Sequence, residues 1–188
     1  TIRELIGERE VFLREKAVGL RSGSYLLAKT VVLALIVTVQ TVLMVGIALM
    51  LNDGPTDATL LGSPGFELAV GCWLTAFTCG LLGLAVSAYV TSSEQVMPVL
   101  VVTIMAQLVL AGGVIPVAGR AVFEQLAWIM PARWGYAMAS ATVNMNAIVP
   151  YRSDGMWEHS SGQWLTDATA LLGLGLVFAV ITYVGLAR

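Results

Sequence analysis

Charged side chains are absent from four long stretches of this 188-residue chain. The stretches are residues 30–51, 68–93, 95–119 and 168–187. A helix of about 20 apolar residues crosses a hydrocarbon core of about 30 Å. The mean hydropathy of +0.83 leaves few polar side chains to cover the surface of a soluble protein. These absences argue against a soluble globular domain and predict an integral membrane protein.

Short segments of alternating polarity, which would indicate a β-barrel, are also missing. Barrel strands are about 10 residues long and alternate in polarity, whereas these stretches are longer and apolar on all sides. Lipid offers no partner for backbone polar groups, so the remaining spanning structure is the helix. We predict an all-α integral membrane fold in which residues 1–188 form part of one transmembrane domain. The four predicted transmembrane helices are residues 30–51, 68–91, 96–118 and 166–187.

Cysteine is scarce, and motifs for nucleotide or enzyme chemistry are missing. Cys72 and Cys79 lie seven residues apart on one predicted helix, about 10 Å along its axis, which is too far for a disulfide. No G-x-x-x-x-G-K-[ST] loop is present, so these residues do not bind ATP. The lone His159 lies near Asp154 and Glu158 and is interpreted as a solvated loop residue rather than a metal ligand. We predict no catalytic residue, no metal and no cofactor in this chain.

Positive charge is distributed unevenly along the chain. Six of the ten Lys and Arg residues lie in the first 29 positions, and residues 52–67 contain none. The positive-inside rule therefore places residues 1–29 and Arg188 in the cytoplasm. Residues 52–67 and 119–165 then lie outside. The chain starts at Thr1 rather than Met, and we expect it to be a piece of a longer polypeptide.

The segment 119–165 is rich in tryptophan, which favours the membrane interface. Residues 121–130 and 134–146 are predicted to be short amphipathic or re-entrant helices divided by Pro131. They are too short and too polar to span a bilayer. An ordinary extracytoplasmic loop is the alternative.

Residues 1–29 have an amphipathic pattern in which charges of both signs alternate with apolar residues. Glu10 and Arg14 can pair one helical turn apart. A lipid anchor would carry a mostly basic polar face, whereas mixed charge suits a protein partner with directional ion pairs. A solvated helix on the membrane surface is the alternative.

Three motifs in register resemble the permease domains of ABCG-type ABC transporters. They are E-R-x-x-F-x-R-E at 8–15, L-A-G-G-V-I-P at 110–116 and W-I-M-P-A-R-W-G-Y-A at 128–137. The resemblance is strongest to actinobacterial half-transporters that carry forkhead-associated domains. It implies that this chain holds membrane helices three to six of a homodimeric exporter in the plasma membrane. The nucleotide-binding domain, with its ATP and Mg²⁺, would lie elsewhere.

The resemblance also implies roles for individual residues. Contact with the nucleotide-binding domain is expected from the coupling segment, at Glu8, Arg9, Phe12, Arg14 and Glu15. An apolar substrate cavity is expected to be lined by Val101, Ile104, Met105 and Leu108. An exit gate is expected at Gly112, Gly113, Val114 and Ile115. The best-studied relatives carry two bulky leucines where this chain has Gly113 and Val114.

Polar residues inside the predicted spans leave two interpretations open. Thr38, Gln40, Thr41, Thr103 and Gln107 either hold helices together or line a substrate path. The sequence as a whole predicts the permease part of an ATP-driven exporter of a lipid, glycolipid or amphipathic compound. A lipid-modifying membrane enzyme, which would have to use Asp154, Glu158 and His159, and a membrane scaffold subunit are the alternatives.

Overall fold

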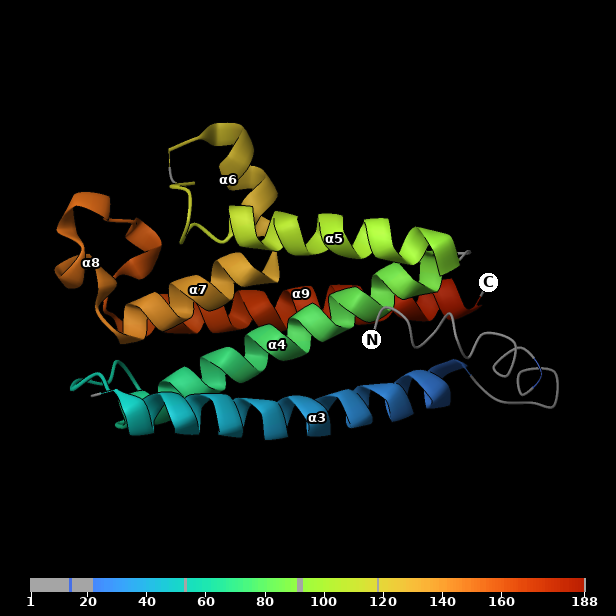
Figure 1. The fold of residues 1–188 in the computed structure, drawn as a ribbon, viewed down its shortest axis with the longest axis horizontal. Helices are drawn as coiled ribbons and strands as arrows, with labels where there is room; N and C mark the ends of the chain where they lie inside the picture. Colours follow the sequence, from blue (N-terminus) through green and yellow to red (C-terminus); the bar gives the residue numbers. More distant parts are fainter. Residues whose placement is uncertain (1–13, 15–21, 53, 91–92, 118, 188) are drawn as a thin grey trace.

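The computed structural model describes residues 14, 22–52, 54–90, 93–117 and 119–187, and each regular element within them is helical. The long helices are α3 (Ser22–Leu51), α4 (Pro64–Tyr89), α5 (Ser93–Leu110) and α9 (Ser161–Ala187). The short ones are α6 (Ala121–Trp128), α7 (Pro131–Thr142), α8 (Met145–Ile148), η1 (Pro150–Arg152) and η2 (Gly155–Trp157). The four long helices run along the long axis of the molecule (Figure 1). The predicted all-α membrane fold is confirmed.

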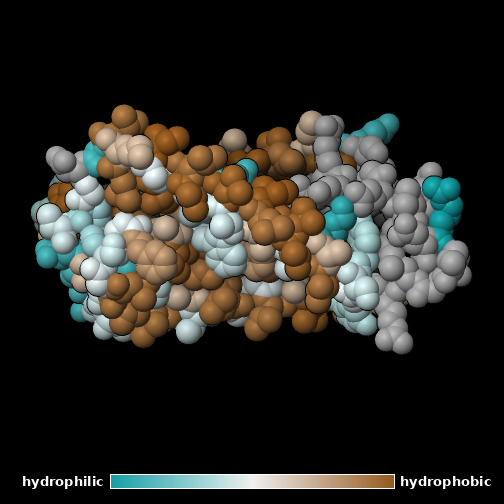
Figure 2. Space-filling model, turned by 90° about the horizontal axis from the view of Figure 1, so that it is seen from below, coloured by the Kyte–Doolittle hydropathy of each residue, from teal (hydrophilic) through white to brown (hydrophobic). Residues whose placement is uncertain are grey.

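Three of these helices, α3, α4 and α9, are long and apolar enough to cross a membrane. Large apolar side chains cover their outer surfaces, as at Leu43 and Leu176, which are 58% and 70% exposed. The space-filling view shows this apolar surface along the middle of the molecule, with hydrophilic residues gathered toward its ends (Figure 2). Such a band matches the hydrocarbon core of a bilayer.

The bundle is centred on α4, which packs against α9, α7 and α3. Helices in lipid gain little from apolar burial, so small residues that permit close approach decide where they meet. A Cβ on Gly80 would lie 2.7 Å from the side chain of Leu33 on α3, and Gly135 of α7 lies directly against Thr75 of α4. Gly175 of α9 similarly faces Leu81. The α4 pattern Ala76-x-x-x-Gly80 therefore serves helix packing.

Helix α5 is shorter than the predicted span 96–118, because it ends at Leu110. Its 18 residues correspond to about 27 Å, close to the thickness of a hydrocarbon core. Gly112 has φ +89°, a left-handed conformation that ends helices and favours glycine. Pro116 follows and cannot continue the helical hydrogen-bonding pattern. The small-residue motif therefore forms a turn after the helix rather than its last turns.

The segment after this turn forms the helix pair α6 and α7, where two short helices were expected. Pro131 begins α7 at the first helical position, where a missing N–H costs nothing. Trp134 Nε1 donates to the carbonyl of Trp128 at 2.8 Å and braces the corner between the two helices. From that corner α7 runs back beside α9 (Figure 1).

The membrane helices also begin earlier than the charge-free stretches, and they include ionisable residues at their ends. Glu67, in the first turn of α4, is fully buried. Its carboxylate accepts hydrogen bonds from the backbone N–H groups of Thr59, Leu60 and Leu61 and from the Thr59 hydroxyl. This set of donors fixes the 54–63 connection against the start of α4.

Candidate substrate cavity and gate

A cavity of about 620 Å³ lies where α4, α5, α7 and the end of α3 approach one another. Its walls are mostly apolar, and its polar wall residues are few. The lining residues are Met44, Cys72, Thr75, Ala76, Ile104, Gln107, Leu108, Ala111, Gly113, Val114, Ala132, Gly135 and Tyr136. An open pocket of this size and composition suits the apolar part of a small amphiphile.

Two of the four predicted cavity residues, Ile104 and Leu108, line this cavity. The other two, Val101 and Met105, are not among the residues that line it. Residues 104 and 108 are one turn apart. The structure thus places only part of the predicted apolar stripe at the wall of this cavity.

Gln107 is the cavity residue with bonds to two other helices. Its Oε1 accepts a hydrogen bond from the backbone N–H of Ala132 in α7 at 2.9 Å. Its Nε2 donates to Sγ of Cys79 in α4 at 3.3 Å. The Gln107 side chain therefore lines the cavity and also connects α5 to α4 and α7. The sequence left helix packing and lining of a substrate path as alternatives for this residue, and the structure supports both.

Two of the four predicted gate residues line the cavity, and the other two do not. Gly113 and Val114 line the cavity, and a Cβ on Gly113 would lie 3.0 Å from the ring of Tyr136. Gly112 is buried behind this wall, where a Cβ would collide with Nη1 of Arg133. Ile115 is 39% exposed and does not line the cavity.

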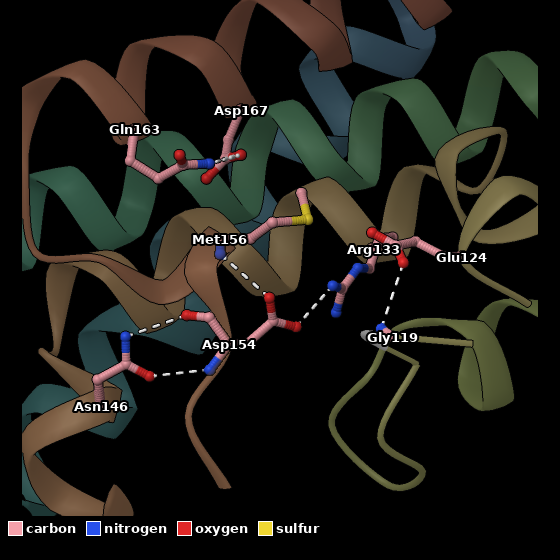
Figure 3. A network of polar contacts seen from close by, with 8 residues as sticks. All are labelled: Gly119, Glu124, Arg133, Asn146, Asp154, Met156, Gln163 and Asp167. Atoms are coloured by element: carbon pink, nitrogen blue, oxygen red, sulfur yellow. Dashed lines mark hydrogen bonds and ion pairs between the residues drawn. The ribbon is translucent and has the colours of Figure 1, made fainter. Parts of the chain in front are cut away.

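The other face of α7 carries a buried ion pair that the sequence analysis missed. Nη2 of Arg133 lies 2.6 Å from Oδ2 of Asp154, and Arg133 is only 1% exposed (Figure 3). Asn146 holds Asp154 through two hydrogen bonds, one to its backbone N–H and one to its carbonyl. Asp154 Oδ1 also accepts from the backbone N–H of Met156. The two residues are 21 positions apart, and no local sequence pattern links them.

A second buried carboxylate, Asp167, lies on α9 near this pair (Figure 3). It is fully buried and accepts a hydrogen bond from Nε2 of Gln163, one turn earlier, at 2.9 Å. Arg133 Nε and Nη1 and Asp167 Oδ2 have no hydrogen-bond partner among the described residues. Polar atoms therefore concentrate between α7, η2 and α9, away from the cavity.

The residues of the alternative enzyme hypothesis are engaged in structural contacts. Asp154 pairs with Arg133, and His159 Nδ1 lies 2.7 Å from the carbonyl oxygen of Ala141. Glu158 is exposed and caps η2. Within the described ranges no group of three or more His, Cys, Asp or Glu side chains could hold a metal ion.

The predicted coupling segment lies largely outside the described residues. Glu8, Arg9, Phe12 and Glu15 all fall in the undescribed part, and Arg14 is described as helical and exposed. The coupling role of these five residues stays a prediction.

Comparison with known proteins identifies the class of this fold. Residues 4–144 match the family described as ABC-2 type transporter, at the level of its membrane domain. The chain belongs to this family, and the predicted resemblance to an ABC transporter permease is confirmed.

A relative in Mycobacterium tuberculosis is named ABC transporter ATP-binding/permease protein Rv1747. It is 43% identical over 192 aligned residues, which cover 100% of this chain. The chain spans 22% of that protein's length and corresponds to its permease region.

Proposed function

We propose that this chain is the membrane-spanning permease part of an ATP-driven exporter. It moves a lipid, glycolipid or other amphipathic compound from the cytoplasmic side outward by alternating access. Two copies face each other, and ATP with Mg²⁺ binds a separate ATP-binding cassette domain, on the same or a companion chain. The name of the mycobacterial relative, which combines ATP-binding and permease functions, supports this division of labour.

The observation that carries the proposal is the apolar cavity between α4, α5 and α7. Apolar walls favour the tail of an amphiphile, because burying a tail removes it from water at about 0.8 kcal/mol per CH₂ group. The cavity lies beside the glycine turn after α5, where Gly112 has a positive φ that favours glycine. A path out of the cavity past Gly113 and Val114 is consistent with this arrangement.

Outward movement requires a defined orientation in the membrane. The charge distribution favours cytoplasmic ends for α3 and α9, and Ser22 Oγ donates to the carbonyl of Leu186, so these two ends lie together. Single cysteines at Thr56 and Ser161 should react with an impermeant thiol reagent outside intact cells. A cysteine at Ala17 should react only after permeabilisation, and its labelling from outside would contradict the orientation and the coupling role of residues 1–29.

The function itself is tested with the complete transporter, including its ATP-binding cassette domain, in proteoliposomes. Fluorescent lipids with different head groups are placed in the membrane, and an impermeant quencher reports which leaflet they occupy. We expect ATP to move at least one of them to the leaflet away from the cassette domain. Export would be contradicted if every lipid and soluble amphiphile tested had the same distribution with ATP as with a non-hydrolysable analogue.

A further inference from the structure

The single amide of Gln107 connects three helices at the wall of the cavity. Its oxygen binds the backbone N–H of Ala132, and its nitrogen binds Sγ of Cys79. The Ala132 N–H belongs to the first turn of α7, where backbone donors have no partner within their own helix. Gln107 therefore supplies from α5 the acceptor that α7 lacks.

Helix α5 has few other ties to the bundle. Its main packing partners are α7 and α6. Large side chains along it are more than half exposed, at Val102 68% and at Leu108 54%. The other polar group of its middle, the Thr103 hydroxyl, donates to Val99 of the same helix and joins nothing across helices. Gln107 therefore supplies two directional bonds from α5 to its neighbours, one to α7 and one to α4.

A cargo in this cavity would meet the same amide. A polar head group taken into an apolar enclosure must find a hydrogen-bond partner, or its desolvation opposes binding. Thr75, another polar wall residue, already donates its hydroxyl hydrogen to Gly71 of its own helix. The Gln107 oxygen is a hydrogen-bond acceptor, so a head group with a hydroxyl or amine donor can compete with the Ala132 N–H for it.

We propose that Gln107 is a hydrogen-bond switch between the cavity and the helix pair α5–α7. In the described state its amide holds α5 against α7 and α4. A cargo whose head group carries hydroxyl or amine donors takes the amide oxygen from Ala132 N–H, and α5 separates from its neighbours. The inference rests on the proposed function for the identity of the cargo, and it makes Gln107 a residue that reads head-group chemistry.

The native thiol of Cys79 reports the switch. The complete transporter carrying Cys72→Ala is placed in nanodiscs without ATP, and the rate of Cys79 modification by N-ethylmaleimide is measured. Gln107→Leu should raise this rate about threefold to fivefold, which is the fold-change for losing one interhelical hydrogen bond. Thr103→Val removes a polar group one turn earlier on α5 without removing an interhelical bond, and it should leave the rate unchanged.

Two probes with the same tail test the role of the head group without changing Gln107. 1-Dodecanol has a hydroxyl donor, and dodecane has no polar atom that could bind either end of the amide. 1-Dodecanol should raise the Cys79 rate in the protein that retains Gln107 and have no effect in Gln107→Leu, and dodecane should have no effect in either. Equal responses to both probes, or equal rates in Gln107→Leu and Thr103→Val, would overturn the switch. A normal switch in a transporter that exports no lipid with ATP would instead contradict the proposed function alone.

Discussion

The two faces of α7 are built in opposite ways. Toward η2 the helix carries Arg133, which is buried and paired with Asp154, and whose Nη1 lies against Gly112 in the turn after α5. Toward α5 it presents the small residues Ala132 and Gly135 to an apolar cavity, and one backbone hydrogen bond to Gln107 crosses to α5. Breaking a buried ion pair leaves an unpaired buried charge and costs several kcal/mol, about 3–5. Breaking one neutral hydrogen bond costs less, about 1–3 kcal/mol. The comparison contrasts a charged contact between α7 and the segment before η2 with a single neutral hydrogen bond between α7 and α5.

The largest effect is expected from breaking the charged face. Asp154→Ala leaves the Arg133 guanidinium buried without its carboxylate, a loss of about 3–5 kcal/mol of stability. Thermal unfolding of the purified protein in detergent, followed by size-exclusion chromatography, measures it. The control is Asp57→Ala, since Asp57 is exposed and should change stability little. Equal unfolding temperatures for the two variants would mean that the ion pair does not hold α7.

A smaller effect is expected where the glycine turn meets Arg133. Gly112→Ala places a side chain at φ +89° and against the guanidinium. It should lower stability by more than about 1 kcal/mol, because both the backbone and the space are incompatible with a Cβ. Gly46→Ala in α3 is the matched control, since a Cβ there has nothing within 4 Å. A Gly112→Ala protein as stable as the control would show that the turn has another conformation.

A substitution at the cavity wall should change the rate of substrate release more than it changes stability. Gly113→Leu pushes against the ring of Tyr136 and should narrow the exit, so that release slows while binding from the cytoplasmic side is largely kept. Single-turnover release of a fluorescent lipid and equilibrium binding separate the two. Gly173→Leu on α9, where a Cβ has open space, controls for added bulk. Equal loss of binding and release would argue against a gate, and a lower dimer yield would indicate a packing role.

The charge-free stretches were enough to predict a helical membrane fold, but they misplaced helix ends. Helices α3, α4 and α9 begin before those stretches and include Lys29, Glu67 and Asp167. A charged residue predicts the end of a membrane helix only where its charge has no partner. Glu67 lies inside α4 because four donors from the 54–63 connection bind its carboxylate. Such partners come from tertiary structure and leave no local pattern.

The contacts of the candidate site also depend on tertiary structure, so the sequence predicted only some of its residues. Family resemblance implied a substrate cavity and a separate exit gate. Ile104 and Leu108 of the first set and Gly113 and Val114 of the second line one cavity, whereas Val101, Met105, Gly112 and Ile115 do not. Helical periodicity could not tell which side of α5 faces the bundle, because the helix is apolar all round. The Arg133–Asp154 pair and the bond from Gln107 to Ala132 join residues 21 and 25 positions apart. One sequence without relatives to compare gives no sign of such pairs.

The central claim is that the cavity face of α5, and not its outward face, carries the cargo. ATP-driven lipid export by the complete transporter tests it in two variants two positions apart on α5, Ile104→Trp and Val102→Trp. Ile104 lines the cavity, and Val102 is 68% exposed on the outside of the same helix. We predict that Ile104→Trp lowers the export rate about tenfold or more, equivalent to about 1.4 kcal/mol, and that Val102→Trp leaves it unchanged. Equal export by both variants, or a greater loss in Val102→Trp, would contradict the account.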